Sequence, residues 1–178
     1  APPALPPTPR VPPPTREKVL FRVDFIAGKP ENWHIDMVRP PKAAGTATQC
    51  GSVPIRPGTT TVFSYVDKLA VPLPAPGHGA FRMTCLVSRP GEKIYLRLRF
   101  PGNFDSLATE VSPDRANEWC EVVIPIRDFK PRGDRRGEGP PKSLPLPGEK
   151  IYGLEIRAGL DNPNPSLHLL SIEVAETP

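Results

Sequence analysis

Hydrophobic and polar positions alternate along most of the chain with a period of two residues. In KVLFRVDF, residues 18–25, four apolar side chains share one face, and Arg22 and Asp24 share the other. A two-residue period is that of a half-buried strand, and no stretch of a dozen residues carries the 3.6-residue period of a helix. The pattern predicts an all-β fold. The further segments that predict strands are 31–37, 59–66, 80–88, 93–100, 107–111, 118–126, 150–159 and 167–175.

The connections between these segments contain the residues that favour turns. Arg89-Pro90-Gly91-Glu92 predicts a tight turn, so 80–88 and 93–100 are expected to pair with each other. Residues 39–58 and 72–79 are rich in Pro, Gly, Ala and Thr and predict loops. Proline makes up 28 of the 178 residues, which favours short strands joined by stiff loops. Nine short strands at this spacing predict a β-sandwich or jelly roll.

The length suits one domain with an extension. Residues 1–17 contain eight prolines and predict an extended polyproline linker, which suggests a module of a larger polypeptide. Residues 18–176 form the predicted β-sandwich domain, with a flexible Gly-, Pro- and Arg-rich insert near 130–149. The net charge of +4 comes with no aromatic-rich basic motif, so nucleic acid is not an expected partner. The chain has no 18-residue apolar run, so no membrane span is expected.

The three cysteines carry no metal-binding or haem-attachment spacing. Strand alternation places Cys85 and Cys120 on apolar faces, where a thiol behaves as a small apolar side chain. Cys50 falls in the predicted loop and is expected to be exposed. The sequence leaves two possibilities open: three free thiols, or one disulfide with the third thiol free.

The segment from Trp119 to Phe129 has the pattern W-x-x-V-x-I-P-I-x-D-F, and it is followed by Ile151-Tyr152-Gly153-Leu154-Glu155-Ile156 and a last strand. These motifs resemble the galactose-binding-like jelly rolls, which include carbohydrate-binding modules and domains of complex I intermediate-associated proteins. The resemblance covers about the last sixty residues. The place of Trp119 beside an apolar strand favours packing in the sandwich, with a sugar platform as the alternative. Some members of these families bind a structural calcium between the terminal strands, so a calcium there is an alternative that the resemblance implies. Only Asp24, Ser171 and Glu173 stand at the corresponding places, fewer oxygens than calcium prefers, so we expect no cofactor and no metal ligand.

Polar side chains on the faces opposite the apolar rows are the candidate ligand-binding residues. In galactose-binding-like modules a sheet face often holds the sugar, and arginine suits an acidic sugar because its planar fork pairs with a carboxylate or sulfate. The alternative is a ladder of cross-strand Arg–Glu pairs that only stabilises the sheet. The predicted binding residues are Tyr95, Arg97, Arg99, Arg82, Arg157 and Trp33.

Nothing in the chain carries a catalytic motif. It has no GxSxG, no HExxH and no phosphate-binding glycine loop, and its acids form no recognisable glycosidase pair. The sequence therefore predicts a non-catalytic module that binds a polysaccharide or glycan, with acidic polysaccharide as the favoured ligand. The alternative is a protein-interaction or scaffolding domain of a larger extracytoplasmic protein. Either role predicts an extracellular or periplasmic location.

Overall fold

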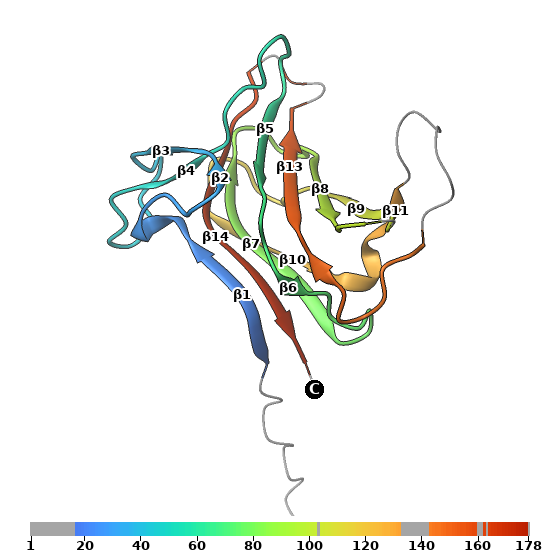
Figure 1. Cartoon of the computed structure of the whole chain (residues 1–178). Coiled ribbons are helices and arrows are strands. Elements are labelled where there is room, and N and C mark those ends of the chain that lie inside the picture. Colours follow the sequence, from blue (N-terminus) through green and yellow to red (C-terminus); the bar gives the residue numbers. More distant parts are fainter. Residues whose placement is uncertain (1–16, 103, 133–142, 160–161, 163, 178) are drawn as a thin grey trace, which may run out of the picture.

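The computed structural model describes residues 17–102, 104–132, 143–159, 162 and 164–177, and they form a sandwich of two six-stranded sheets (Figure 1). The predicted all-β fold is confirmed. Two 3-10 turns, η1 (Phe25–Ala27) and η2 (Ile126–Asp128), are the helical elements of the described residues. Fourteen strands appear there, more than the nine expected, because several are only two or three residues long.

Sheet A has the strand order β10–β7–β14–β4–β3, and β1 pairs with β14 as well. Its strands are β1 (Lys18–Asp24), β3 (Asp36–Val38), β4 (Cys50–Ser52), β7 (Gly79–Val87), β10 (Cys120–Pro125) and β14 (Leu167–Glu176). Figure 1 shows β14 between β1 and β7 in the middle of the molecule. The strand that comes last in the described chain is thus central in its sheet.

Sheet B has the strand order β11–β9–β8–β13–β5–β2 and runs from β2 on one side of the molecule to β11 on the other (Figure 1). Its strands are β2 (Trp33–His34), β5 (Val62–Val66), β8 (Ile94–Arg99), β9 (Ser106–Val111), β11 (Lys130–Arg132) and β13 (Gly153–Ala158). A separate two-stranded ribbon joins β6 (Val71–Pro72) to β12 (Lys150–Ile151). Every pairing inside these sheets is antiparallel.

One apolar core lies between the two sheets, and the alternation along each strand explains it. On β8 the side chains of Ile94, Leu96 and Leu98 are buried, while Arg97 and Arg99 between them are partly exposed. Inward and outward positions alternate in the same way on the other long strands. The large side chains of this core include Phe25, Trp33, Phe81, Met83, Ile94, Leu96, Leu98, Phe129, Ile151, Leu154, Ile156, Leu167, Leu169 and Ile172.

The predicted hairpin of residues 80–88 with 93–100 is wrong. The turn itself is present, since the Glu92 N–H donates to the Arg89 carbonyl at 3.3 Å, but β7 belongs to sheet A and β8 to sheet B. The turn carries the chain from one sheet to the other, which lets the apolar rows of both strands face the same core. Glu92 stabilises this arch from inside, because its buried carboxylate accepts a hydrogen bond from Asn162 Nδ2 at 2.9 Å.

The loops predicted at 39–58 and 72–79 contain short strands. Residues 50–52 form β4, which pairs with β14 and β3, and Pro72 ends β6. Cys50 is therefore fully buried, and the expectation that it is exposed is wrong. The predicted strand 31–37 divides at Ile35 into β2 of sheet B and β3 of sheet A.

The predicted linker and insert fall mainly outside the described residues, which exclude 1–16 and 133–142. Both stay predictions. The insert begins with β11 at the edge of sheet B, and Ser143 at its far end forms a parallel bridge with Phe104. In the described parts of the chain, no helix has the length and apolar character needed to cross a membrane.

Candidate ligand-binding face of sheet B

The outward side of sheet B collects polar and aromatic side chains from all six of its strands, and we call it the sheet B face. The strand register defines its rows. One row runs from Arg97 on β8 through Glu155 on β13 and Tyr65 on β5 to His34 on β2. A second row runs from Glu110 on β9 through Tyr95 on β8 and Arg157 on β13 to Phe63 on β5. The sequence predicted the first members of each row but not that they lie side by side.

The Tyr95 ring contacts two guanidinium groups at the centre of this face. The Cζ atom of Arg157 lies 4.4 Å from the centroid of the Tyr95 ring, and that of Arg132 lies 4.8 Å from it. Arg132 Nη1 also donates a hydrogen bond to the Tyr95 hydroxyl. Cation–π contacts of this kind stabilise both partners by about 0.5–2 kcal/mol. The two guanidinium groups therefore gather positive charge beside Tyr95, which is only 9% exposed.

Arg97 and Arg99 lie beside Tyr95 and share one carboxylate, Glu155. Arg97 Nη1 lies 3.7 Å from Glu155 Oε2, and Arg99 Nε lies 3.4 Å from Glu155 Oε1. Arg97 Nε donates to Ser106 Oγ at 2.9 Å, and Arg99 Nη2 pairs with Asp67. These contacts include cross-strand Arg–Glu pairs, which the sequence analysis gave as the alternative to ligand binding. They also leave the Arg97 and Arg99 side chains about 30% exposed, so both side chains remain accessible to a ligand.

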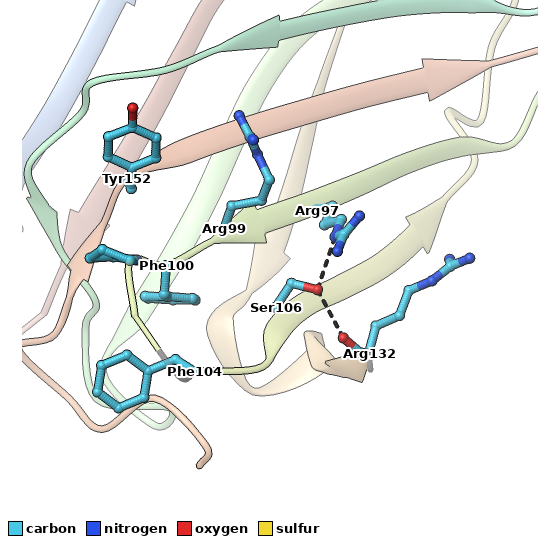
Figure 2. Close-up of a pocket in the computed structure, with 8 residues that line it drawn as sticks. Arg97, Arg99, Phe100, Phe104, Ser106, Arg132 and Tyr152 are labelled. Atoms are coloured by element: carbon cyan, nitrogen blue, oxygen red, sulfur yellow. Dashed lines mark hydrogen bonds between the residues drawn. The ribbon is translucent and has the colours of Figure 1, made fainter. Parts of the chain in front are cut away.

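Two pockets open on the sheet B face, and Arg132 lines both. The first has a volume of about 340 Å³. Figure 2 shows Arg97, Arg99 and Arg132 around it, with the rings of Phe100, Phe104 and Tyr152 at its other end. The second pocket has a volume of about 220 Å³ and is lined by Arg56, Thr61, Lys93, Tyr95, Glu110, Arg132, Arg157 and Ala158. Four cationic groups and one carboxylate line this second pocket, which gives it an excess of positive charge.

An aromatic cluster extends the face beyond β13, and the sequence reasoning missed it. The rings of His34 and Tyr65 stack with centroids 5.0 Å apart, and Phe63 lies 5.8 Å from Tyr65. Arg56 lies over Phe63 at 5.2 Å. Tyr65 is 37% exposed, so its ring is available to a ligand. The alternation of Phe63 and Tyr65 with buried Val62, Ser64 and Val66 was a signal that could have placed them on an outer face.

Trp33 and Arg82 do not lie on the sheet B face. Trp33 is 3% exposed, packs edge-on against Phe25, and donates from Nε1 to Ser64 Oγ at 3.1 Å. It is a core residue. Arg82 lies on β7 of sheet A, where it pairs with Glu17 and Glu173. The hydrogen bond to Glu17 raises the pKa of Arg82, and that contact lowers the pKa of Glu17.

The resemblance gave a structural calcium between the terminal strands as an alternative. At that place the structure has ion pairs. Arg22 donates to Asp24 Oδ1 at 2.9 Å and to Glu173 Oε2 at 2.8 Å. Glu173 also accepts from Arg82, so its carboxylate already has two cationic partners. Across the part of the chain that the structure describes, no group of three or more His, Cys, Asp or Glu side chains is placed to hold a metal ion.

The β-sandwich has the jelly-roll fold that the sequence predicted, and this fold is shared with several solved carbohydrate-binding modules. The family 11 carbohydrate-binding module from Clostridium thermocellum, solved with a β-1,3-1,4-mixed-linked tetrasaccharide, matches with a TM-score of 0.52 at 16% identity, over 90% of this chain and 95% of that one. The CBM22-1 xylan-binding domain of Paenibacillus barcinonensis Xyn10C matches with a TM-score of 0.53 at 11% identity, over 90% and 95% of the two chains.

A conserved carbohydrate esterase from the Shiga toxin-encoding bacteriophage phi24B is similar to the same degree. Its TM-score is 0.52 at 11% identity, over 92% of this chain and all of that one. No protein-family model matches the sequence, and the comparison with curated proteins gave no match. At these identities the likeness establishes the fold, and function has to be argued from the site.

Proposed function

We propose that this chain is a non-catalytic carbohydrate-binding module and that the sheet B face holds an acidic polysaccharide. The observation that carries the proposal is the charge of the second pocket, where Arg56, Lys93, Arg132 and Arg157 surround Tyr95 with Glu110 as the one carboxylate. A uronate or sulfate group supplies the negative charge that this arrangement favours. Arginine forms two parallel hydrogen bonds to such a group, which fixes the orientation of the sugar as well as its charge.

The aromatic side chains at both ends of the face support the same ligand class. Tyr152, 40% exposed, lines the first pocket, and Tyr65 stands on the far side of β13. Sugar rings present apolar C–H surfaces, and aromatic side chains offer broad apolar area with a polar edge. A chain of several sugars lying across β8, β13 and β5 would contact arginine and aromatic groups in turn. This geometry favours a polymer over a single sugar.

The acidic groups of the face support binding rather than hydrolysis. Glycoside hydrolysis uses two carboxylates flanking the scissile bond, whereas Glu110 is the only acid lining either pocket in the described residues. Esterase chemistry needs a hydroxyl beside a base. The Ser106 hydroxyl instead donates to the Arg132 carbonyl and accepts from Arg97. We therefore propose no catalytic residue, and incubation with acidic and acetylated polysaccharides should release neither reducing ends nor acetate.

A polysaccharide ligand also suggests that the module works outside the cytoplasm, where such polymers are met. The alternative function remains docking of a protein partner through the same fold. Retardation by polysaccharides distinguishes the two, because a protein-docking surface gives none.

The test is affinity electrophoresis in gels that contain neutral polysaccharides, such as xylan and mixed-linkage β-glucan, or acidic ones, such as polygalacturonate and chondroitin sulfate. We expect retardation in the acidic gels that falls as salt is added. Arg157→Ala should weaken binding about tenfold, since a hydrogen bond to a charged group contributes about 1.5–3 kcal/mol.

Arg82→Ala is the matched control, because it removes the same side chain from a strand of the other sheet. It should bind like the unmodified protein. Equal losses in the two variants would show that retardation reflects net charge alone, and the absence of retardation in every gel would overturn the proposal.

A further inference from the structure

Cys85 and Cys120 lie directly opposite each other on neighbouring antiparallel strands of sheet A. The register pairs Cys120, the first residue of β10, with Cys85 on β7. Residues that are direct partners in an antiparallel ladder point to the same face. Cys120 Sγ also lies 3.7 Å from the Cys85 carbonyl oxygen. Both are free thiols in the structure.

We propose that Cys85 and Cys120 form a redox-active dithiol that closes to a cross-strand disulfide. Directly opposite residues have Cβ atoms about 4.5–5.5 Å apart, and a disulfide needs about 3.5–4.5 Å. The remaining approach is small. It falls at the end of β10, an edge strand that pairs, within the described residues, with β7 alone, so its backbone can adjust on the side away from β7.

The two thiols differ in solvent exposure, and this difference gives them different roles in the exchange. Cys120 is partly exposed and lines a pocket of about 480 Å³ together with Trp119, Asp114 and Arg115. Cys85 is fully buried behind it, and burial raises the pKa of its thiol. Only the thiolate attacks a disulfide. Cys120 is therefore the thiol that meets an oxidant first, and Cys85 is the thiol that resolves.

The oxidant class is a low-molecular-weight disulfide, and the exchange balances in two steps. The Cys120 thiolate attacks one sulfur of the oxidant, forms a mixed disulfide, and releases one thiolate. Cys85 then attacks Cys120 Sγ while its thiol proton passes to the departing small thiolate, which breaks the mixed disulfide and releases the second small thiol. Two protein thiols are oxidised, and one small disulfide is reduced to two thiols.

Cys50 cannot take part in this bond. It lies on β4, which β14 separates from β7, so about two strand spacings, or roughly 10 Å, separate it from Cys85. That distance exceeds the roughly 7 Å limit between the Cα atoms of a disulfide. Cys50 therefore serves as an internal control thiol when the oxidation products are mapped.

The bond would close a loop that contains β8 and β9, and with them Tyr95, Arg97 and Arg99. It would also join the edge strand β10 covalently to the centre of sheet A. The inference does not depend on the ligand of the sheet B face, since neither cysteine lines its pockets.

The experiment treats the full chain with oxidised glutathione, blocks remaining thiols, and maps the products by mass spectrometry. We expect the chain to lose two hydrogen atoms and to yield the Cys85 peptide linked to the Cys120 peptide, with Cys50 alkylated only after denaturation. The unfolding midpoint should rise by about 5–10 °C and return when a reductant is added.

Cys50→Ser is the matched control and should behave in the same way, whereas Cys120→Ser should show neither the linked peptide nor the shift. Recovery of both thiols unmodified would overturn the proposal. So would a glutathione adduct that persists on Cys120, because it would mean that Cys85 cannot reach the mixed disulfide. Neither outcome bears on polysaccharide binding, which is measured separately.

Discussion

Gly153 on β13 lies directly opposite Arg99 on β8, and the guanidinium of Arg99 occupies the space that a side chain at position 153 would take. A Cβ atom built on Gly153 would come within 2.6 Å of Arg99 Nη2. The missing side chain lets Arg99 reach Asp67 and Glu155 at once. One glycine therefore sets the position of a predicted ligand-binding arginine.

Gly153→Ala should displace Arg99 and weaken binding of acidic polysaccharide, by roughly tenfold if one charge-assisted hydrogen bond is lost. Stability should change little, because the atoms that must move are the end of a flexible side chain. Gly77→Ala is the control, since nothing lies within 4 Å of its Cβ position. Affinity electrophoresis and thermal unfolding of both variants check this. A large drop in the unfolding midpoint with unchanged retardation would contradict it.

Glu155→Gln should strengthen binding of acidic ligands a few-fold at low salt. The substitution removes the carboxylate that pairs with Arg97 and Arg99, so both guanidinium groups become available and the local charge becomes more positive. Glu173→Gln is the matched control, because Glu173 also pairs with two arginines, Arg22 and Arg82, but on sheet A.

The two glutamate variants change the net charge equally and should lose similar, small amounts of stability. Titration with an acidic oligosaccharide separates them. If Glu173→Gln raises the affinity as much as Glu155→Gln does, the effect belongs to total charge and not to the sheet B face.

Trp33→Phe should destabilise the fold by about 1–3 kcal/mol and leave binding unchanged. The indole N–H donates to Ser64 Oγ inside the core, and its loss leaves a buried polar group without one partner. Trp119→Phe should cost less, because its indole donates to the Lys42 carbonyl near the surface. Chemical denaturation measures both. A binding defect in Trp33→Phe without loss of stability would return Trp33 to the ligand site.

Stability should fall as the pH drops below about 6.5 because of His168. Burial lowers the pKa of this imidazole in the folded state, so the unfolded chain takes up a proton first. The contribution is fully present above the unfolded pKa of about 6.5 and is lost as the pH falls toward the folded value. His168→Gln should flatten the unfolding free energy between pH 7 and 5. An unchanged slope would mean that another group carries the dependence.

Strand positions could be predicted from the sequence because alternation is a local property. The sheet to which each strand belongs could not. Alternation places Arg82 and Arg97 on outward faces alike, yet one belongs to sheet A and the other to sheet B. The difference lies in pairings between residues far apart in the chain, such as Arg82 with Glu173 and Arg97 with Glu155. The spacing of residues along the sequence does not indicate these partners.

The candidate site was predicted in part for the same reason. Tyr95, Arg97, Arg99 and Arg157 come from two strands with clear alternation, and they do meet on one face. The stacking of His34 on Tyr65 depends on the pairing of β2 with β5, and β2 is only two residues long. A strand that short leaves no periodic signal. Cys50 was misplaced for the same reason, since β4 has three residues in a Gly-rich segment.

The central place of β14 in sheet A has a consequence for how the protein is made. β14 lies between β7 on one side and β1 and β4 on the other, so the β7–β10 pair, the β3–β4 pair and β1 cannot join into one sheet until residues 167–176 have been synthesised. Until then, the apolar rows of β1 and β7 lack the strand that lies between them in the folded sheet. Folding then waits on contacts between distant residues, which is slow. A ribosome stalled before Leu167 should hold an unfolded, aggregation-prone chain.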